Sequence, residues 1–350
     1  MSSAAGRLQD SWTAPILGPL QSRVVMTAMT RNFADARHCA TPAMAEYYAR
    51  RAAHGVGLIL TEGTIVHPSG DGYRSVPYIF DQEQTASWRR VTDRVHAEGA
   101  RIFCQLWHCG RISHPEFLGG QDPVSATDRA AKGVNKQNDK PYGVPRRLRV
   151  DELPAIYEIF RHAASNALTA GFDGVELHLG HGYLPDQFFD ARVNDRDDQY
   201  GGSVENRCRF SLELTRAVLD ECGSERVIAR ISPSRFMEGL YDWPDLDEMI
   251  GYLIPAFDDI GLRMLDISGA RSDYFETSGR VIRQVRPLWP YLLIGGASLP
   301  PEQAQGELDA GLIDLVTYGR WLIANPDLVA RFRSGVALRP YDRAMLDQLE

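Results

Sequence analysis

Two histidines and a tyrosine lie close together in the stretch GFDGVELHLGHGYLPDQFF, residues 171–189. The apolar run 175–177 ends in His178, His181 follows three residues later, and Tyr183 comes two residues after that. Imidazole N–H groups can stabilise an oxyanion, and a phenol with a pKa near 10 can deliver a proton to a carbanion. One interpretation is a histidine pair that polarises a substrate oxygen, with the tyrosine as proton donor.

Two other interpretations of the histidines remain open. The H-x-x-H spacing could bind a metal ion, but such a site would need a third ligand. Glu62 is the only carboxylate that ends another apolar run, so we expect no metal ion. Alternatively, both imidazoles could be structural groups whose hydrogen bonds are satisfied within the fold.

The elements that must position these residues can be identified from eight short apolar runs. The runs are nearly continuous rather than alternating, which is typical of strands buried on both faces; they cover residues 24–29, 57–63, 101–107, 174–178, 227–232, 264–269, 291–297 and 315–319. Amphipathic segments with helix-start and glycine-stop signals lie between them, including residues 41–55, 81–99, 151–171 and 300–311. Eight strand–helix units predict a (β/α)8 TIM barrel, and we expect residues 1–350 to form one domain. An open doubly wound sheet is the main alternative, although no G-x-G-x-x-G follows any run.

The carboxyl ends of barrel strands are where chemistry is expected. Besides the histidine loop, these ends hold Thr30, Glu62, Gly63, Gln105, Trp107, His108, Arg230, Ser232, Ser268, Gly295, Gly296, Ala297, Gly319 and Arg320. Residues 108–149 form a long polar segment after the third strand, here named the capping loop. Loops of this length usually act as lids or binding loops.

Glycine and arginine indicate an anion site at the last two strands. Glycine follows both strands, and Arg320 comes next, which fits a phosphate held by backbone N–H groups and a bidentate cation. The glycines could instead simply turn the chain. Arg230 lies within the apolar run VIARIS, where a cation needs a partner. That partner could be a protein carboxylate or a bound anion.

Composition excludes several classes of function. The net charge of −8 disfavours a nucleic-acid partner. The five cysteines show no C-x-x-C spacing, so neither a disulfide framework nor a metal cluster is expected, and a reducing cytoplasm is the natural location. We expect no signal peptide and no membrane span. The three lysines, Lys132, Lys136 and Lys140, all lie in the capping loop, so Schiff-base chemistry has no candidate at a strand.

These residues together resemble the old yellow enzyme family of FMN-dependent ene-reductases. The resemblance rests on VVMTAMTR, CQLWHCGRISHP, the histidine stretch with NDRDDQYGGSVENRCRF after it, ARISP and YGRWLIANPDLVARF, in this order over about residues 12–340. It implies non-covalent FMN at the top of the barrel and NAD(P)H as reducing co-substrate. It further implies that hydride passes from the flavin to the β-carbon of an activated alkene.

The resemblance also implies a role for each site residue. Those at the flavin would be Ala28, Met29, Thr30, Gly63, Gln105 and Arg230, with Gly296, Ala297, Gly319 and Arg320 at its phosphate. His178 and His181 would hold the carbonyl or nitro oxygen of the substrate, Tyr183 would protonate its α-carbon, and Tyr73 and Trp107 would line the substrate side. Arg230 would face N1 and O2, where reduced flavin carries negative charge.

Three departures from the family pattern stand out. Ala28 occupies a position that is usually proline, and Ala297 one that is often glycine. The chain ends at Glu350, whereas many members continue into a tail with an aromatic residue over the site. Thr30 and Trp107 are typical of the classical subgroup.

The predicted function is an NAD(P)H-dependent ene-reductase, as a monomer or homo-oligomer. A dedicated biosynthetic reductase or isomerase on the same FMN barrel is one alternative. A flavin-free phosphosugar lyase or isomerase is another, which the lack of a strand-end lysine and the few carboxylates disfavour.

Overall fold

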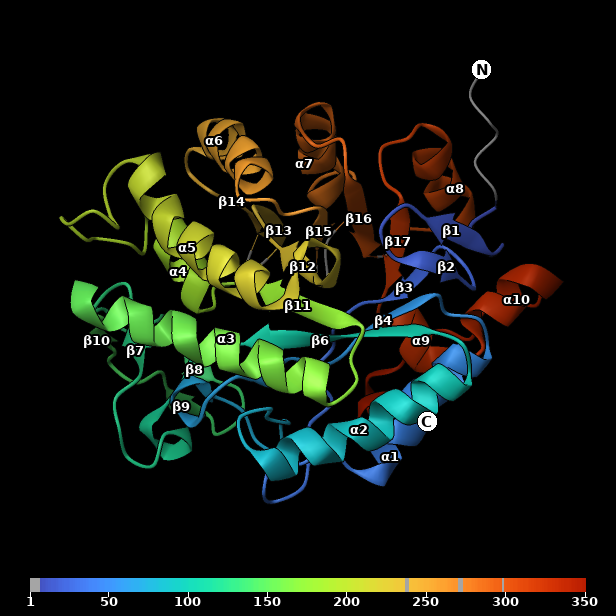
Figure 1. The fold of residues 1–350 in the computed structure, drawn as a ribbon, viewed down its shortest axis with the longest axis horizontal. Helices are drawn as coiled ribbons and strands as arrows, with labels where there is room; N and C mark the ends of the chain where they lie inside the picture. Colours follow the sequence, from blue (N-terminus) through green and yellow to red (C-terminus); the bar gives the residue numbers. More distant parts are fainter. Residues whose placement is uncertain (1–6, 237–238, 270–272, 298) are drawn as a thin grey trace.

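A closed ring of parallel strands forms the centre of the computed structural model, which describes residues 7–236, 239–269, 273–297 and 299–350. The eight strands of the ring are β3 (Val24–Met26), β4 (Leu58–Leu60), β6 (Arg101–Trp107), β11 (Gly174–His178), β12 (Val227–Arg230), β15 (Met264–Ser268), β16 (Leu292–Ala297) and β17 (Leu315–Tyr318). Each strand pairs with its neighbour in this order, and β17 also pairs with β3, which closes the ring. The predicted (β/α)8 barrel is confirmed (Figure 1).

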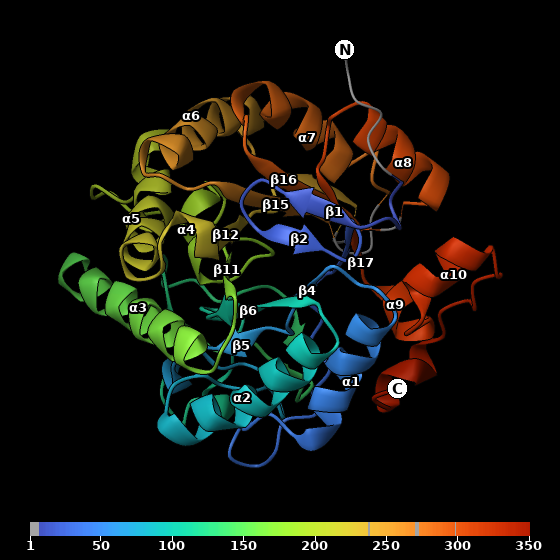
Figure 2. The ribbon, with the colours of Figure 1, turned by 45° about the vertical axis from the view of Figure 1, so that its right-hand side comes forward.

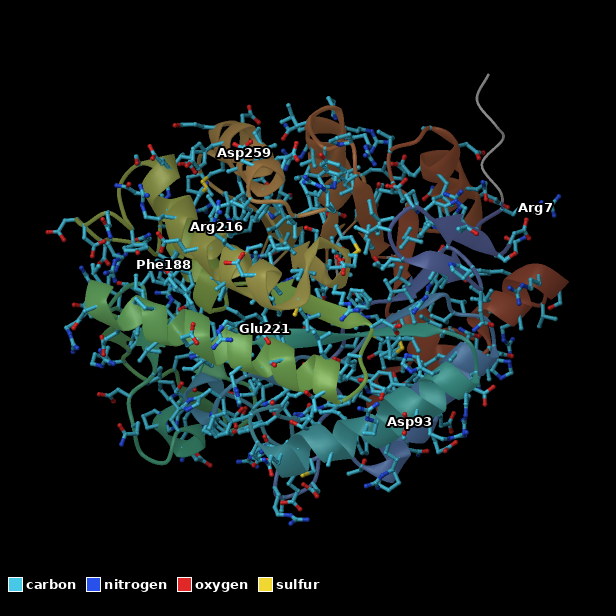
Figure 3. The ribbon with its side chains drawn as sticks, viewed as in Figure 1. Arg7, Asp93, Phe188, Arg216, Glu221 and Asp259 are labelled. Carbon is cyan, nitrogen blue, oxygen red and sulfur yellow. The ribbon has the colours of Figure 1, made fainter. Side chains whose placement is uncertain are left out.

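Helices surround this ring on its outside (Figure 1). They are α1 (Pro42–Ala53), α2 (Gln82–Ala97), α3 (Leu153–Thr169), α4 (Leu184–Phe189), α5 (Val204–Cys222), α6 (Leu246–Asp259), α7 (Ser278–Val285), α8 (Pro301–Asp309), α9 (Arg320–Ala324) and α10 (Leu328–Ser334). The predicted start signals act as caps: Thr41 accepts the N–H of Met44, and Asp81 accepts that of Gln84. In Figure 3, Glu221 lies on α5 where this helix runs beside α3, and Arg161 of α3 donates to it at 2.8 Å.

The strands separate two apolar cores. Helix side chains and the outward faces of the strands form the larger one. The smaller core lies inside the barrel and includes Phe103, Ile228 and Met264. A short hairpin, β1 (Trp12–Ala14) with β2 (Gly18–Leu20), adds Ala14 and Leu20 to it. Figure 2 shows this hairpin across one end of the ring, where Ala14 and Leu20 pack against the barrel interior.

Several barrel strands are shorter than the apolar runs that predicted them. β3 ends at Met26 rather than residue 29, and β4 at Leu60 rather than residue 63. After each end the backbone bonds once more to a neighbouring strand, from Thr27 N–H to the carbonyl oxygen of Tyr318 and from Thr61 N–H to that of Phe103. A hairpin after β12, formed by β13 (Ser234–Phe236) and β14 (Leu240–Asp242), was not predicted.

The capping loop contains short paired segments. β7 (Val124–Ser125) pairs with β10 (Arg146–Arg147), and β8 (Val134–Asn135) pairs with β9 (Lys140–Pro141). Ser125 donates a hydrogen bond of 2.9 Å to Gln187 of α4, which fastens the loop beside the histidine stretch. Among the helices described, none has the length and apolar character needed to cross a bilayer.

Candidate active site

The loop between β11 and α4 presents both histidines at the open end of the barrel. His181 adopts a left-handed conformation with φ 59°, which is strained for a residue with a side chain. Its N–H donates to Ser232 Oγ at 2.6 Å, and the N–H of Gly182 donates to Asp186 at 2.6 Å. Gly180 must be glycine, because a Cβ there would lie 2.6 Å from Ser232 Oγ. These contacts fix the loop in one shape.

The two imidazole rings lie side by side with ring nitrogens free to bind a ligand. Their centroids are 5.3 Å apart. In the described part of the chain, neither ring nitrogen of His181 nor Nδ1 of His178 has a hydrogen-bond partner, although all three atoms are buried. Burial, and then the charge of Arg230, lower the pKa of both histidines well below the ordinary value. Both rings are therefore neutral, and each can donate one N–H to a substrate oxygen.

These observations bear on the two alternative interpretations of the histidines. Structural histidines would have their nitrogens satisfied by the protein, which is not what the described residues show. In the same part of the chain, no three His, Cys, Asp or Glu side chains are grouped so as to hold a metal ion. The arrangement favours the oxyanion-binding interpretation.

Tyr183 stands beside the histidines in an aromatic group. Its ring centroid lies 5.0 Å from that of His178 and 4.9 Å from that of Trp107. Its hydroxyl shares a hydrogen bond of 2.8 Å with the hydroxyl of Tyr73. Burial, and then Tyr73, raise the pKa of Tyr183 well above 10, so the phenol keeps its proton. The structure thus brings the four substrate-side residues, Tyr73, Trp107, His178 and His181, together with the predicted acid Tyr183.

One open cavity, of about 160 Å³, collects most of the predicted site residues. It is lined by Ala28, Thr30, Gln105, Trp107, His178, His181, Tyr183 and Arg230. Met29 instead packs against the larger core, and its sulfur would lie 3.1 Å from a Cβ at Gly319. Gly63 is placed against Trp107, whose ring would be 2.4 Å from a Cβ at this position. This position requires glycine because the indole of Trp107 leaves no room for a side chain.

Arg230 has both a protein carboxylate and the cavity as neighbours. Its Nε lies 3.6 Å from Asp266 Oδ2, an ion pair with little exposure of either side chain. That nitrogen nevertheless has no hydrogen bond to the described residues. Below the cavity, Gln105 Nε2 donates to Glu176 Oε2 at 2.6 Å. Arg230 therefore has the protein carboxylate that one interpretation expected as its partner. Its guanidinium also lines the cavity in which an anion would bind.

The predicted phosphate residues lie at the ends of two neighbouring strands, with Gly296 and Ala297 at the end of β16 and Gly319 and Arg320 directly after β17. Gly296 is in register with Thr317, and Ala297 with Tyr318, so the ends of β16 and β17 meet. Gly296 has φ 135°, and a Cβ there would lie 2.8 Å from the carbonyl oxygen of Thr317. Arg320 is exposed at the start of α9, with its guanidinium carbon 5.4 Å from the ring centroid of Tyr341 in the short C-terminal tail.

Several residues that hold the site residues in place were not predicted from the sequence. Asp186 accepts from Arg235 at 2.9 Å and from the indole of Trp243 at 2.9 Å, besides the N–H of Gly182. Glu176 and Asp266 lie inside apolar runs and were assigned no role. A charged residue within an apolar run is the feature that could have identified Glu176 and Asp266, as it identified Arg230.

Comparison with known proteins agrees with this geometry. The model of the NADH:flavin oxidoreductase / NADH oxidase family matches residues 18–339. The chain belongs to the old yellow enzyme family. It is 40% identical to 12-oxophytodienoate reductase 7 of Oryza sativa subsp. japonica over 94% of this chain and 90% of that protein. It is 35% identical to 12-oxophytodienoate reductase 2 of Arabidopsis thaliana over 95% of this chain and 92% of that one.

Solved structures of this family share the fold closely. The old yellow enzyme homologue from Zymomonas mobilis superposes with a TM-score of 0.90 at 33% identity, covering 97% of this chain and 96% of that one. Morphinone reductase superposes with a TM-score of 0.89 at 36% identity, covering 99% of this chain and 94% of that one. The protein is an FMN-dependent oxidoreductase of the old yellow enzyme type, and its FMN is bound non-covalently.

The residues at the barrel mouth fit this cofactor. Thr30, Gln105 and Arg230 line one cavity and offer a hydroxyl, an amide and a cation to the edge of a flat polar ring. Arg230 is buried and lines this cavity, so its guanidinium can face a bound anion. The ends of β16 and β17 provide backbone close to a cation, as a phosphate requires.

Proposed function

We propose that the protein reduces activated C=C bonds of α,β-unsaturated carbonyl or nitro compounds with NAD(P)H. The observation that supports this most is the pair of neutral imidazoles with unsatisfied nitrogens next to a protonated phenol. An oxyanion clamp beside an acid suits a reaction in which charge builds up on oxygen while carbon takes up a proton.

Each residue has a defined part in the proposed reaction. Thr30 and Gln105 hold the edge of the FMN ring, Arg230 faces its electron-rich side, and the ends of β16 and β17 with Arg320 hold its phosphate. His178 and His181 donate N–H groups to the carbonyl or nitro oxygen, and Tyr183 delivers a proton to the α-carbon. When bound, FMN supplies the hydride that the alkene receives. NAD(P)H and the alkene use the same open cavity in turn, which gives ping-pong kinetics.

One experiment tests the reaction class. The purified yellow protein is mixed anaerobically with NADH or NADPH, and loss of the flavin absorbance is followed. 2-Cyclohexenone is then added, and we expect the absorbance to return together with formation of cyclohexanone. Bleaching without reoxidation by enones or nitroalkenes would refute ene-reduction while leaving the flavoprotein assignment intact.

A dedicated substrate on the same barrel remains the second candidate, because relatives are named as 12-oxophytodienoate reductases. A panel of alkenes that includes 12-oxophytodienoate distinguishes the two. A preference of several orders of magnitude for one compound would favour the dedicated enzyme.

A further inference from the structure

Two carboxyl groups lie inside the barrel directly below the cavity, and the proposed reaction does not use them. Glu176 of β11 and Asp266 of β15 are both fully buried. They lie on the two strands that flank β12, which carries Arg230. Buried carboxyls in an apolar core are costly unless they are paired or protonated, so their presence needs an explanation.

The strand register shows that these groups form one polar layer. Phe103, Ile228 and Met264 belong to the apolar interior core. The residues two positions later on the same strands are Gln105, Arg230 and Asp266, and they point inwards too because side chains alternate along a strand. Glu176 is in register with Gln105, and Asp266 with Arg230. The layer thus separates the apolar interior from the cavity.

Each carboxyl group of the layer accepts one hydrogen bond from a neighbouring side chain. Glu176 Oε2 accepts from Gln105, and Asp266 Oδ2 accepts from Ser268 Oγ at 3.0 Å. The remaining oxygens, Glu176 Oε1 and Asp266 Oδ1, receive no N–H or hydroxyl donor from the described residues. The two carboxyl groups interact with each other, and each affects the pKa of the other. A bond between two carboxyl groups requires one proton.

The position of this proton follows from the surroundings. Burial, and then the charge of Asp266, raise the pKa of Glu176 well above its ordinary value. Burial also raises the pKa of Asp266, but Arg230 beside it opposes this rise. These surroundings favour the proton on Glu176 and the negative charge on Asp266, whose Oδ2 lies 3.6 Å from Arg230 Nε.

We propose that Glu176 and Asp266 share one proton and hold one negative charge between them, and that this pair sets the effective charge of Arg230 towards FMN. The proposal rests on the assignment of Arg230 to the flavin edge. A cation near the ring favours reduced FMN because reduction adds negative charge, and a neighbouring anion weakens that effect. The pair also directs the amide of Gln105, whose Nε2 is taken by Glu176. Both carboxyls are positioning residues that act through Arg230 and Gln105.

The reduction potential of bound FMN tests the shared charge. It is measured in the holoprotein by dithionite titration against a redox dye, for wild type, Glu176→Gln, Asp266→Asn and the double variant. Glu176→Gln imitates the protonated acid and should leave the potential nearly unchanged. In Asp266→Asn, Glu176 should ionise and take over the charge, so the change should again be small.

The double variant should behave differently from either single one. With no carboxylate left, Arg230 is unopposed, and reduced FMN should bind at least tenfold more tightly relative to oxidised FMN. Tenfold corresponds to a rise in potential of about 30 mV for a two-electron couple. Glu213→Gln is the matched control, because Glu213 lies on α5 and accepts from the hydroxyls of Tyr157 and Tyr200. Its loss should not change the potential.

Three results would overturn the proposal. An unchanged potential in the double variant would mean that the pair does not act on FMN. If the potential rose equally in both single variants, and the two rises added up in the double variant, the two carboxyl groups would carry two separate charges. A rise in Glu176→Gln as large as in the double variant would place the charge on Glu176 alone.

A second measurement covers the case in which the double variant does not fold. The infrared difference spectrum of wild type minus Glu176→Gln should contain the C=O stretch of one protonated carboxyl at neutral pH, and its absence would refute the shared proton. Dithionite titration needs neither NAD(P)H nor an alkene. Failure of the proposed ene-reduction would therefore be detected separately from failure of this inference.

Discussion

Replacing Tyr183 by phenylalanine separates proton delivery from every other role of this side chain. The substitution keeps the ring, which packs against Trp107 and His178 at centroid distances of 4.9 and 5.0 Å. It removes one hydrogen bond, the 2.8 Å contact with Tyr73. A neutral hydrogen bond contributes about 0.5–1.5 kcal/mol to stability, so the variant should fold and bind FMN.

The effect on catalysis should be larger than the effect on stability. A placed general acid accelerates its step by ~10²–10⁴-fold, which is ~3–5 kcal/mol of barrier at 1.36 kcal/mol per tenfold. Reoxidation by 2-cyclohexenone should slow by this factor in Tyr183→Phe, while reduction by NAD(P)H should remain nearly as fast as in wild type. Nitroalkenes should suffer less, because a nitronate is stable enough to leave and take its proton from water.

Stopped-flow absorbance of the flavin resolves the two half-reactions. Tyr73→Phe is the matched control, because it removes the same hydrogen bond and keeps the acid; it should slow enone reduction far less. Since the raised pKa of Tyr183 keeps its proton beyond pH 10, the wild-type enone step should not decline as pH approaches that value. Equal slowing of both half-reactions in Tyr183→Phe would make Tyr183 a positioning residue. An unaffected enone step would remove it from the mechanism.

Three further predictions concern FMN, the histidines and a buried acid. Arg320→Ala should weaken FMN at least tenfold in equilibrium dialysis, because charge-assisted hydrogen bonds contribute about 1.5–3 kcal/mol each; unchanged affinity would place the phosphate elsewhere. A para-substituted phenol should give a long-wavelength charge-transfer band, and His178→Ala/His181→Ala should abolish it; a retained band would refute the clamp. Burial raises the pKa of Glu62 from 4.5 to about 7, so its contribution to stability is present below pH 4.5 and lost as pH rises through 7. Glu62→Gln should therefore gain up to ~3 kcal/mol over wild type above pH 7 in urea unfolding, and no gain below pH 4.5; a gain independent of pH would contradict the assignment.

The barrel could be predicted because its signals are local. Strands covered on both faces give continuous apolar runs, and helix ends are marked by capping side chains and glycines. Strand lengths were overestimated where pairing stops but apolar residues continue, as after Met26. The β13–β14 hairpin was missed because strands of three residues carry too little periodicity to be recognised.

The candidate site was predictable to the extent that it follows the strand ends. His178, Gln105 and Arg230 end barrel strands or lie near their ends, and they line one cavity as expected. Met29 packs against the larger core and lies beside Gly319, contacts that sequence position alone could not show. Ser232 and Asp186 were not assigned roles because Ser232 accepts the N–H of His181 from a different loop, and Asp186 accepts from Arg235 and Trp243 of the segment after β12. Such contacts depend on how two loops meet in three dimensions.

The buried carboxyl pair could be predicted from the sequence only in part. Three adjacent strands of the barrel, β11, β12 and β15, carry Glu176, Arg230 and Asp266 within apolar runs. A buried charge requires a partner, so three such charges on neighbouring strands already imply that they meet. Which of them share a proton depends on register, because a slip of one residue would turn Asp266 to the outer face of its strand. The charge opposite Arg230 is therefore decided by strand register and not by any motif.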